Sequence, residues 1–367
     1  MKKTYSKKTV LYNKHIELGG RLVDFGGYIL PLYYSSIKSE HNSVRKDAGI
    51  FDVSHMCEII ISGKKCEEFV QEITVNDTNN LTYGNVQYTL MCNHYGGIID
   101  DLLVYKKKTS FMLVLNAGNV KRKISWIKSL IKEDVTIENV SEKTSLIALQ
   151  GPNSRKILEK LIDSNLENLL YYNFIETNIS NKKIILSRTG YTGELGYEIY
   201  LNVSDAEYVW NKIMNAGKKF SLVPAGLGCR DTLRTEMGYV LYGNEINENT
   251  SPLEAGLNWV VKFDKGDFIG KSALINKEKK TERKLVFIEM EDGAIPRRNY
   301  QIIKKNKTIG SITSGTISPS LGKGIAMGYV LSEFSNVKNT IQVDIRGQLR
   351  PGVIINGPFY KSGSVKS

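Results

Sequence analysis

Residues 96–105 read GGIIDDLLVY, a glycine pair followed by an apolar strand that carries two adjacent aspartates. If side chains alternate along this strand, Asp101 shares one face with Ile99 and Leu103, and Asp100 lies on the other. Both faces are then mostly apolar, which predicts a strand covered on both sides. A carboxylate in such a place needs a charge partner, several hydrogen bonds or a ligand. The alternative is a tight turn with a self-satisfied aspartate, and this stretch alone does not decide between them.

The length and composition predict a globular protein of two or three domains. The chain has 367 residues, of which 41% are hydrophobic and 24% charged. It contains no run of eighteen apolar residues, so we expect no membrane span. The first eight residues, MKKTYSKK, are basic but lack the apolar stretch of a secretion signal. We therefore expect a cytoplasmic protein, or a mitochondrial matrix protein if this is a processed organellar form.

The spacing of the cysteines and histidines and the net charge of the chain limit which metals and binding partners we expect. The four cysteines show no paired spacing, which is typical of a reducing compartment, and the four scattered histidines form no metal-ligand pattern. We therefore expect no metal. The formal charge of +12 predicts an anionic partner or a simple margin of solubility. Because the lysine clusters are not interleaved with aromatic residues, an acidic protein or a polyanionic small molecule fits better than nucleic acid.

Strands and helices alternate along much of the chain. Two similar strand-glycine-helix units are expected, one with strand 58–62 and helix 65–73, the other with strand 145–150 and helix 154–162. A third helix is expected to start at Ser204, where a capping pattern precedes an apolar run. Mixed α+β structure with antiparallel sheets is the natural prediction. Further strands, with hairpin-like spacing, are expected at residues 86–92, 98–105, 111–116, 183–188 and 196–201.

The helical periodicity stops after a polar, lysine-rich stretch at residues 276–283, which we interpret as a linker or an exposed helix end. Short strands separated by turn residues follow it, and these predict a small all-β domain. We therefore divide the chain into residues 1–280 and residues 281–367. The expected strands of the second part lie at residues 284–289, 301–303, 308–312, 325–330 and 340–345.

A second group of polar residues lies in the glycine-rich stretch SRTGYTGELGYEIY at residues 187–200. The expected strand at its end puts Glu198 beside Tyr200 on one face. The glycines would let the backbone approach a flat ligand closely. The alternative is a hairpin with Glu198 exposed to solvent.

A third group begins a charged helix, GLGCRDTLRTE at residues 226–236. Arg230 and Arg234 lie one turn apart and could reach one site. The alternative is an exposed helix with surface ion pairs. The segment FDVSHM at residues 51–56 is less informative, because a histidine beside a methionine before a strand more often packs than reacts.

Taken together, these segments resemble the aminomethyltransferase family, the T-protein of the glycine cleavage system. The resemblance covers almost the whole chain and its motifs occur in order. It implies three domains in a cloverleaf, with two interleaved α+β lobes around a folate pocket and a C-terminal β-barrel. The matching motifs are VDFGG at 23–27, DAGIFDVSHM at 47–56, GGIIDD at 96–101, SRTGYTGE at 187–194, GCRDTLR at 228–234, GSITSGTIS at 310–318 and PFY at 358–360.

The resemblance also implies a reaction and its partners. The family transfers the methylene of an aminomethyl group from the lipoyl arm of a small carrier, the H-protein, to tetrahydrofolate. The products are 5,10-methylenetetrahydrofolate, ammonia and the dihydrolipoyl carrier. H-proteins are typically acidic and the glutamate tail of folate is anionic, so both partners would suit the positive charge of this chain.

Site residues follow from the matching positions. Asp101, rather than Asp100, occupies the catalytic position, where it would orient the folate and stabilise developing positive charge. Glu198 matches the carboxylate that holds the pterin edge, and Arg230 matches a pocket arginine that supports folate binding. The other matching positions are the aromatic residues Tyr191 and Tyr88, the polar wall residue Asn116, Met56 facing the entrance of the lipoyl arm, and Arg297 near the pocket mouth.

Two relatives of the same fold remain as alternatives, because a shared fold does not establish the substrate. One is a tetrahydrofolate-dependent demethylase, whose members depart from the Ser-His-Met pattern at 54–56 and the RTGYTGE pattern at 188–194 that are intact here. The other is a non-catalytic folate-binding factor for iron–sulfur cluster assembly. Those factors carry a cysteine in a Lys-Gly-Cys type of loop, a context that none of the four cysteines has.

Overall fold

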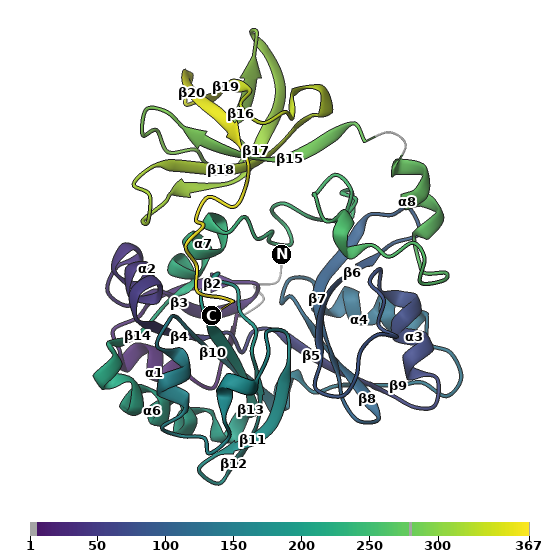
Figure 1. Cartoon of the computed structure of the whole chain (residues 1–367), viewed down its shortest axis with the longest axis vertical. Coiled ribbons are helices and arrows are strands. Elements are labelled where there is room, and N and C mark those ends of the chain that lie inside the picture. Colours follow the sequence, from purple (N-terminus) through teal and green to yellow (C-terminus); the bar gives the residue numbers. More distant parts are fainter. Residues whose placement is uncertain (1–5, 279–280, 367) are drawn as a thin grey trace.

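The computed structural model describes residues 6–278 and 281–366. Figure 1 shows three lobes, with a β-barrel at the top of the view and two α+β lobes below it. The chain begins in the first α+β lobe, builds most of the second, returns to the first, adds residues 240–274 to the second and then forms the barrel. The predicted α+β class, with two interleaved lobes and a C-terminal barrel, is confirmed.

The first lobe is built on a six-stranded sheet with helices packed against one face. Strand β10 (Thr144–Gln150) is apolar almost throughout, so both of its faces are covered. Ile147 and Leu149 pack towards helix α6 (Ala206–Gly217), while the alternate side chains face the second lobe. The other elements are α1 (Tyr12–Glu17), α2 (Ile37–Lys46), β4 (Ala48–Asp52), α5 (Ser154–Leu158), β11 (Phe174–Ile179), β12 (Lys182–Ser187), β13 (Gly196–Asn202), β14 (Leu222–Pro224) and α7 (Leu227–Glu236). The strand order is β11-β12-β13-β10-β4-β14.

A small three-stranded sheet lies beside the first lobe. It consists of β1 (Lys7–Lys8), β2 (Arg21–Phe25) and β3 (Tyr28–Tyr33), in the order β1-β3-β2. Residues 1–5 of the basic start of the chain lie outside the described residues. The turn between β2 and β3 contains two glycines with positive φ, Gly26 and Gly27, which is a conformation that glycine adopts easily. This turn brings Gly26 close to the cavity described below.

The second lobe is a five-stranded antiparallel sheet that packs between two helices and the first lobe. Apolar side chains on one face meet those helices, and the other face meets the sheet of the first lobe. Its elements are β5 (Cys57–Ser62), α3 (Cys66–Ile73), β6 (Val86–Cys92), β7 (Ile98–Lys106), β8 (Ser110–Leu115), α4 (Val120–Ser129), β9 (Thr136–Asn139) and α8 (Lys271–Glu278). The strand order is β6-β7-β8-β5-β9.

Strand β7 contains the two aspartates and a β-bulge. Asp100 pairs with Met91 of β6, but Ile98 pairs with Cys92, so Ile99 is an extra residue in the ladder. Ile99 packs in the apolar cluster covered by α3 and α4. The prediction that Ile99 shares a face with Asp101 was therefore wrong, because the bulge interrupts the alternation at that residue.

The barrel closes with six strands in the order β15-β18-β17-β16-β19-β20. The predicted division after residue 280 falls between the end of α8 and the start of the barrel; we keep it as a proposal. Residues 279–280 of the lysine-rich stretch lie outside the described residues, and the part before them is the end of α8. The strands are β15 (Arg283–Met290), β16 (Gln301–Lys304), β17 (Lys307–Ile317), β18 (Gly324–Leu331), β19 (Thr340–Ile345) and β20 (Gln348–Ile355), the last of which was not predicted.

Two predicted helices differ in their bounds. Helix α5 ends at Leu158 rather than at residue 162, because the amides of Lys160 and Leu161 bond to carbonyls three residues back, as in turns. The third helix starts at Ala206 rather than at Ser204, which lies in a short 3-10 turn where the Asn202 side chain accepts a hydrogen bond from the Ser204 amide. None of the described helices is both long and apolar enough to cross a membrane.

Candidate functional site

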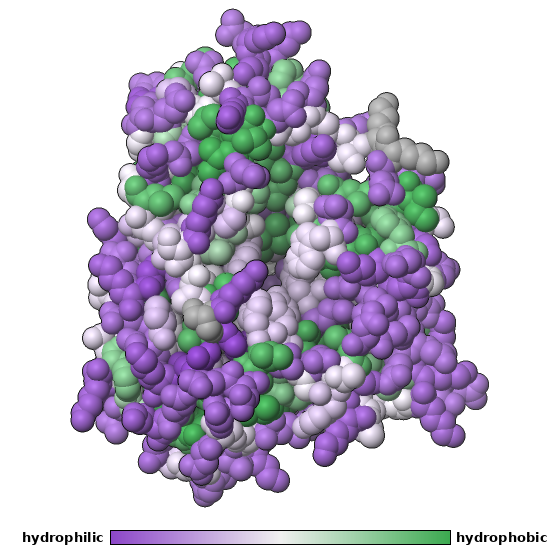
Figure 2. All heavy atoms as spheres, in the orientation of Figure 1, coloured by the Kyte–Doolittle hydropathy of each residue, from purple (hydrophilic) through white to green (hydrophobic). Residues whose placement is uncertain are grey.

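A cavity of about 1390 Å³ lies where the two α+β lobes and the barrel meet. Figure 2 shows a hollow with hydrophobic surface between the barrel and the lobe beside it. The structure brings all eight predicted site residues to this cavity, although they come from distant parts of the chain. These residues are Met56, Tyr88, Asp101, Asn116, Tyr191, Glu198, Arg230 and Arg297.

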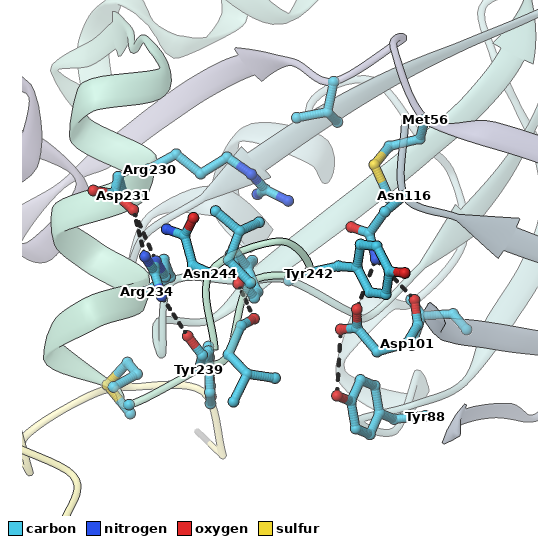
Figure 3. Close-up of a pocket in the computed structure, with 18 of the residues that line it drawn as sticks. Met56, Tyr88, Asp101, Asn116, Arg230, Asp231, Arg234, Tyr239, Tyr242 and Asn244 are labelled. Carbon is cyan, nitrogen blue, oxygen red and sulfur yellow. Dashed lines mark hydrogen bonds and ion pairs between the residues drawn. The ribbon is translucent and has the colours of Figure 1, made fainter. Parts of the chain in front are cut away.

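Asp101 belongs to the wall formed by the second lobe (Figure 3). Its Oδ1 accepts a hydrogen bond from Asn116 Nδ2 at 2.7 Å, and its Oδ2 accepts one from the Tyr88 hydroxyl at 3.3 Å. Asn116 follows β8 and Tyr88 lies on β6, the two strands that flank β7. Burial raises the pKa of Asp101, and the nearby Lys123 ammonium and the Asn116 amide oppose this rise. The carboxylate is therefore held rigidly at the cavity wall.

Asp100 points away from the cavity and is fully buried. Its Oδ1 lies 2.7 Å from Lys123 Nζ, and it also accepts hydrogen bonds from the backbone and side-chain nitrogens of Asn116. Burial raises the pKa of Asp100 to about 7, against the opposing effect of Lys123. Asp100 thus fixes Asn116, which in turn fixes Asp101. The turn interpretation of the two aspartates was wrong, because both lie within a strand.

Lys123 is a residue of this wall that the sequence interpretation missed. It is only 2% exposed and also donates a hydrogen bond to the Asn116 carbonyl. The sequence pattern did indicate a buried lysine here, because Lys123 occupies the same face of α4 as Val120, Ile124 and Ile127. A lysine on the apolar face of a helix predicts a buried partner for its charge.

Glu198 reaches the cavity from β13 of the first lobe. It is 7% exposed, so the alternative of a solvent-exposed hairpin carboxylate was wrong. Its Oε2 accepts a hydrogen bond from the Thr189 hydroxyl at 2.5 Å, while within the described residues its Oε1 has no hydrogen-bond partner. Burial raises the pKa of Glu198, and the Thr189 hydrogen bond and the Arg230 charge oppose this rise. One carboxylate oxygen is thereby left available for a ligand.

Arg230 extends from α7 into the space between the two walls (Figure 3). Its guanidinium carbon lies 4.6 Å from the centre of the Tyr191 ring, and that ring stacks on Tyr239 with centroids 5.7 Å apart. The buried Nη1 of Arg230 has no hydrogen-bond partner among the described residues. An unpaired buried guanidinium nitrogen is costly, so it marks a position where a ligand would bind.

Arg234 also lines the cavity, but its guanidinium is engaged by the protein. It pairs with Asp231 and Glu245 at 2.8 Å each and donates to the Tyr239 carbonyl and to the Ser314 hydroxyl of the barrel. The two arginines therefore reach one site, as predicted, with different surroundings. Arg234 holds the loop after α7 against the barrel.

The mouth of the cavity contains predicted and unpredicted residues. Met56 is half-buried before β5, and Arg297 is exposed on a barrel loop where it donates to the Gly315 carbonyl. Trp259, which was not predicted, is 58% exposed and stacks on Tyr88 with ring centroids 6.0 Å apart. It lies in a short 3-10 helix, Asn258–Val260, whose sequence has no periodic pattern, so the sequence offered no signal for it.

His55 also lines the cavity, although we expected FDVSHM to be packing rather than chemistry. Its ring packs edge-on against Phe25 with centroids 5.5 Å apart, and its buried Nδ1 has no hydrogen-bond partner among the described residues. Burial and the Arg230 charge lower the pKa of His55 to about 4.

Across the described residues, no group of three or more His, Cys, Asp or Glu side chains could hold a metal ion.

Fold and cavity together define a class of protein: a three-lobed α+β and β-barrel protein whose central site suits a flat ligand with polar edges. Two family descriptions match the sequence: "GCVT N-terminal domain" over residues 11–265 and "Glycine cleavage T-protein C-terminal barrel domain" over residues 283–361. The chain belongs to the glycine cleavage T-protein family, and it is an aminomethyltransferase.

Individual relatives support the same family assignment, and they are similar to this chain over nearly its full length. The aminomethyltransferase of Halothermothrix orenii is 47% identical over 355 residues, which cover 96% of this chain and 99% of the relative. That of Bacillus subtilis is 45% identical over 359 residues, or 97% and 99% of the two chains. The crystal structure of glycine cleavage system aminomethyltransferase T from Bartonella henselae is similar with a TM-score of 0.92 and 30% identity, covering 98% of this chain and 99% of that one.

Proposed function

We propose that this aminomethyltransferase takes the methylene of an S-aminomethyl group from the lipoyl arm of an acidic H-protein and gives it to tetrahydrofolate. One C–S bond and one C–N bond to the methylene break, and two C–N bonds form, to folate N5 and N10. The two protons released from these nitrogens go to the lipoyl sulfur and to ammonia, which leaves as ammonium. The products are 5,10-methylenetetrahydrofolate and the dihydrolipoyl carrier.

The observation that carries the proposal is the carboxylate of Asp101, held at the cavity wall by Tyr88 and Asn116. The transferred fragment is cationic, and a fixed carboxylate in a partly buried site stabilises positive charge more strongly than a carboxylate in bulk water does. Asp101 would orient the folate nitrogens and stabilise the developing iminium-like charge. Its rigid support suits this task, because no reorganisation is needed during the reaction.

The opposite wall fits the pterin. Glu198 offers one unpaired oxygen and Arg230 one unpaired nitrogen, which suit the 2-amino-4-oxo edge of the ring and its neighbouring acceptors. Tyr191 offers an aromatic face beside them. The cavity volume of about 1390 Å³ exceeds that of ordinary ligand pockets, which is consistent with a folate together with a lipoyl end.

The charge of the chain supports the choice of partners. Arg297 and Arg298 line the barrel side of the cavity, where a folate glutamate tail would find cations. The net charge of +12 would attract an acidic carrier from a distance. Met56 at the mouth would contact the lipoyl chain.

The direct test mixes the protein with tetrahydrofolate and an aminomethyl-loaded lipoyl H-protein, and follows ammonia and methylenetetrahydrofolate. We expect the two products in equal amounts, with neither formed when folate is omitted. A sulfonium or N-methyl substrate turned over in place of the carrier would instead support the demethylase alternative.

Replacing Glu198 by alanine should weaken tetrahydrofolate binding by about tenfold to a hundredfold, because a charged hydrogen bond to the pterin edge is lost. Isothermal titration calorimetry measures the dissociation constant. Asn178→Ala, a change of an exposed residue on β11 in the same sheet, is the control and should bind like the unchanged protein. An unchanged dissociation constant in Glu198→Ala would remove Glu198 from the folate site.

Replacing Lys123 by methionine should move the acid side of the pH–activity profile to higher pH. Burial already raises the pKa of Asp101, and the Lys123 ammonium opposes this, so its removal raises that pKa further. Because the ionised carboxylate is the active form, activity is then lost at a higher pH as the pH falls. The kcat/KM measured between about pH 5 and 9 reports the shift.

Lys128→Met is the matched control, since Lys128 is exposed on the same helix. Circular dichroism establishes that both variants are folded. A folded Lys123→Met enzyme with an unmoved acid side would show that Lys123 does not tune Asp101.

A further inference from the structure

The chain does not end at the barrel. After β20, residues 356–366 run from the barrel to the first lobe and lie beside α7, as the yellow C-terminal segment in Figure 1 shows. Gly357 and Pro358 line the cavity on the way. The backbone nitrogen of Tyr360 donates to the carbonyl of Glu236 at the end of α7. The segment thus touches the helix that carries Arg230.

Farther along, the segment binds the loop at residues 190–195, which carries Tyr191. The backbone nitrogen and the hydroxyl of Ser364 both donate to Glu194 Oε2, at 2.9 and 2.5 Å, and the Leu195 nitrogen donates to the Ser364 hydroxyl at 3.0 Å. The Val365 nitrogen donates to the Gly193 carbonyl at 3.1 Å. Four hydrogen bonds therefore join the two segments over a few residues.

The backbones of the C-terminal segment and the loop at residues 190–195 also approach each other closely. A Cβ atom on Gly363 would lie 2.3 Å from the Gly193 carbonyl oxygen, so only glycine lets the backbones approach this far. Glu194 is 2% exposed, and its other oxygen pairs with Arg45 at 2.8 Å. Ser364 thus supplies the hydrogen bonds that this buried carboxylate would otherwise lack.

The loop is held from its other side by Gln150. The Gln150 amide donates to the Thr189 carbonyl and accepts from the Thr192 hydroxyl. The loop therefore lies between a fixed side chain of β10 and the C-terminal segment. The Tyr191 ring lies between Arg230 and Tyr239, so a shift of the loop would move the aromatic face of the cavity.

We propose that residues 360–365 act as a strap that positions Tyr191 and Arg230 for the ligand, with Gly363 and Ser364 as positioning residues. The ligand identity rests on the proposed function; the effect on the loop does not. Among the described residues, the contacts of the strap are with the side of the cavity that carries Tyr191 and Arg230, and none is with the Asp101 wall. The strap should therefore affect folate binding and leave the lipoyl side unchanged.

The test compares the full chain with a chain ending at Lys361 and with Ser364→Ala. Hydrogen–deuterium exchange of residues 190–195 is measured without any ligand, and we expect exchange at least about tenfold faster in both variants. Tetrahydrofolate should bind about tenfold more weakly to each. The KM for the loaded carrier should stay close to that of the full chain.

Controls separate positioning from general damage. Ser364→Thr keeps the hydroxyl and should restore slow exchange and folate affinity. Ser362→Ala changes an exposed residue of the same segment and should behave as the full chain does. Unchanged exchange and folate affinity in both test variants would overturn the strap. If the full chain itself fails to bind tetrahydrofolate, the proposed function fails, while the exchange rates still decide whether the strap orders the loop.

Discussion

Replacing Asp101 by asparagine lowers the turnover number of aminomethyl transfer by about a hundredfold to a thousandfold, and by no less than about tenfold. The change keeps the shape of the side chain and removes its charge. Loss of a preorganised group that faces developing charge has effects of this size in other enzymes. Because the Glu198 and Arg230 wall is untouched, tetrahydrofolate should still bind with a dissociation constant within about threefold of the original. Turnover and calorimetric binding, measured on one preparation, check both expectations.

The neighbouring aspartate provides the matched comparison. Asp100→Asn makes the same substitution one residue away, but that carboxyl group faces Lys123 and not the cavity. We expect a much smaller loss of turnover from it, through its contact with Asn116. Equal losses in the two variants, or full activity in Asp101→Asn, would contradict the assignment of Asp101 as the catalytic residue.

Replacing Arg45 by methionine is expected to lower the free energy of unfolding by about 3–5 kcal/mol, the cost of breaking a buried ion pair from one side. Arg45 is 8% exposed and pairs with Glu194 and Glu236, each at 2.8 Å. Glu236 also accepts hydrogen bonds from Ser318 and Ser320 of the barrel. The change therefore leaves two buried carboxylates short of a counter-charge where the first lobe meets the barrel.

Urea unfolding followed by circular dichroism measures this effect, with Lys46→Met as the control. Lys46 is the exposed neighbour on α2, and its replacement should change the free energy of unfolding by less than about 0.5 kcal/mol. The two variants unfolding at the same urea concentration would show that the cluster does not stabilise the junction.

The same cluster predicts how stability depends on pH. Hydrogen bonding and charge from His41, together with Arg45, hold the pKa of Glu236 at about 2, below its ordinary value of 4.5, despite burial. A lowered carboxyl pKa stabilises the fold fully above the unfolded value and loses this contribution as the pH falls through the folded value. The stability from Glu236 should therefore decline between about pH 4.5 and 2, and less steeply in Arg45→Met.

Much of the fold was readable from local patterns. The strands at residues 86–92 and 340–345 were predicted with their observed bounds, because alternating or continuous apolar residues between turn signals specify a strand. The strand β20 was missed since it contains Pro351, which cannot donate a hydrogen bond, and Gly352, and both residues argue against a strand. In the closed barrel both neighbouring strands hold it in place.

In the candidate site, too, some residues were predicted from the sequence and others were missed. The eight predicted residues line one cavity, and they had been assigned from the resemblance of motifs of a few residues each to a known family. Lys123 was overlooked although its position on the apolar face of α4 indicates a buried charge. Trp259 and Ser364 were not predicted, because each owes its place to a residue far away in the sequence. Trp259 stacks on Tyr88, and Ser364 binds Glu194.

Local patterns in the sequence were enough to predict the α+β class and a C-terminal all-β domain, and the family resemblance added the interleaved lobes and the candidate site residues. The resemblance singled out Asp101 over Asp100, but the physical difference between their surroundings is visible only in the folded molecule. The two residues are chemically identical, and a bulge at Ile99 interrupts the pattern just before them. Which carboxylate meets Lys123 and which meets the cavity follows from how β7 packs against α4 and the first lobe. That packing joins segments far apart in the chain, and no local pattern encodes it.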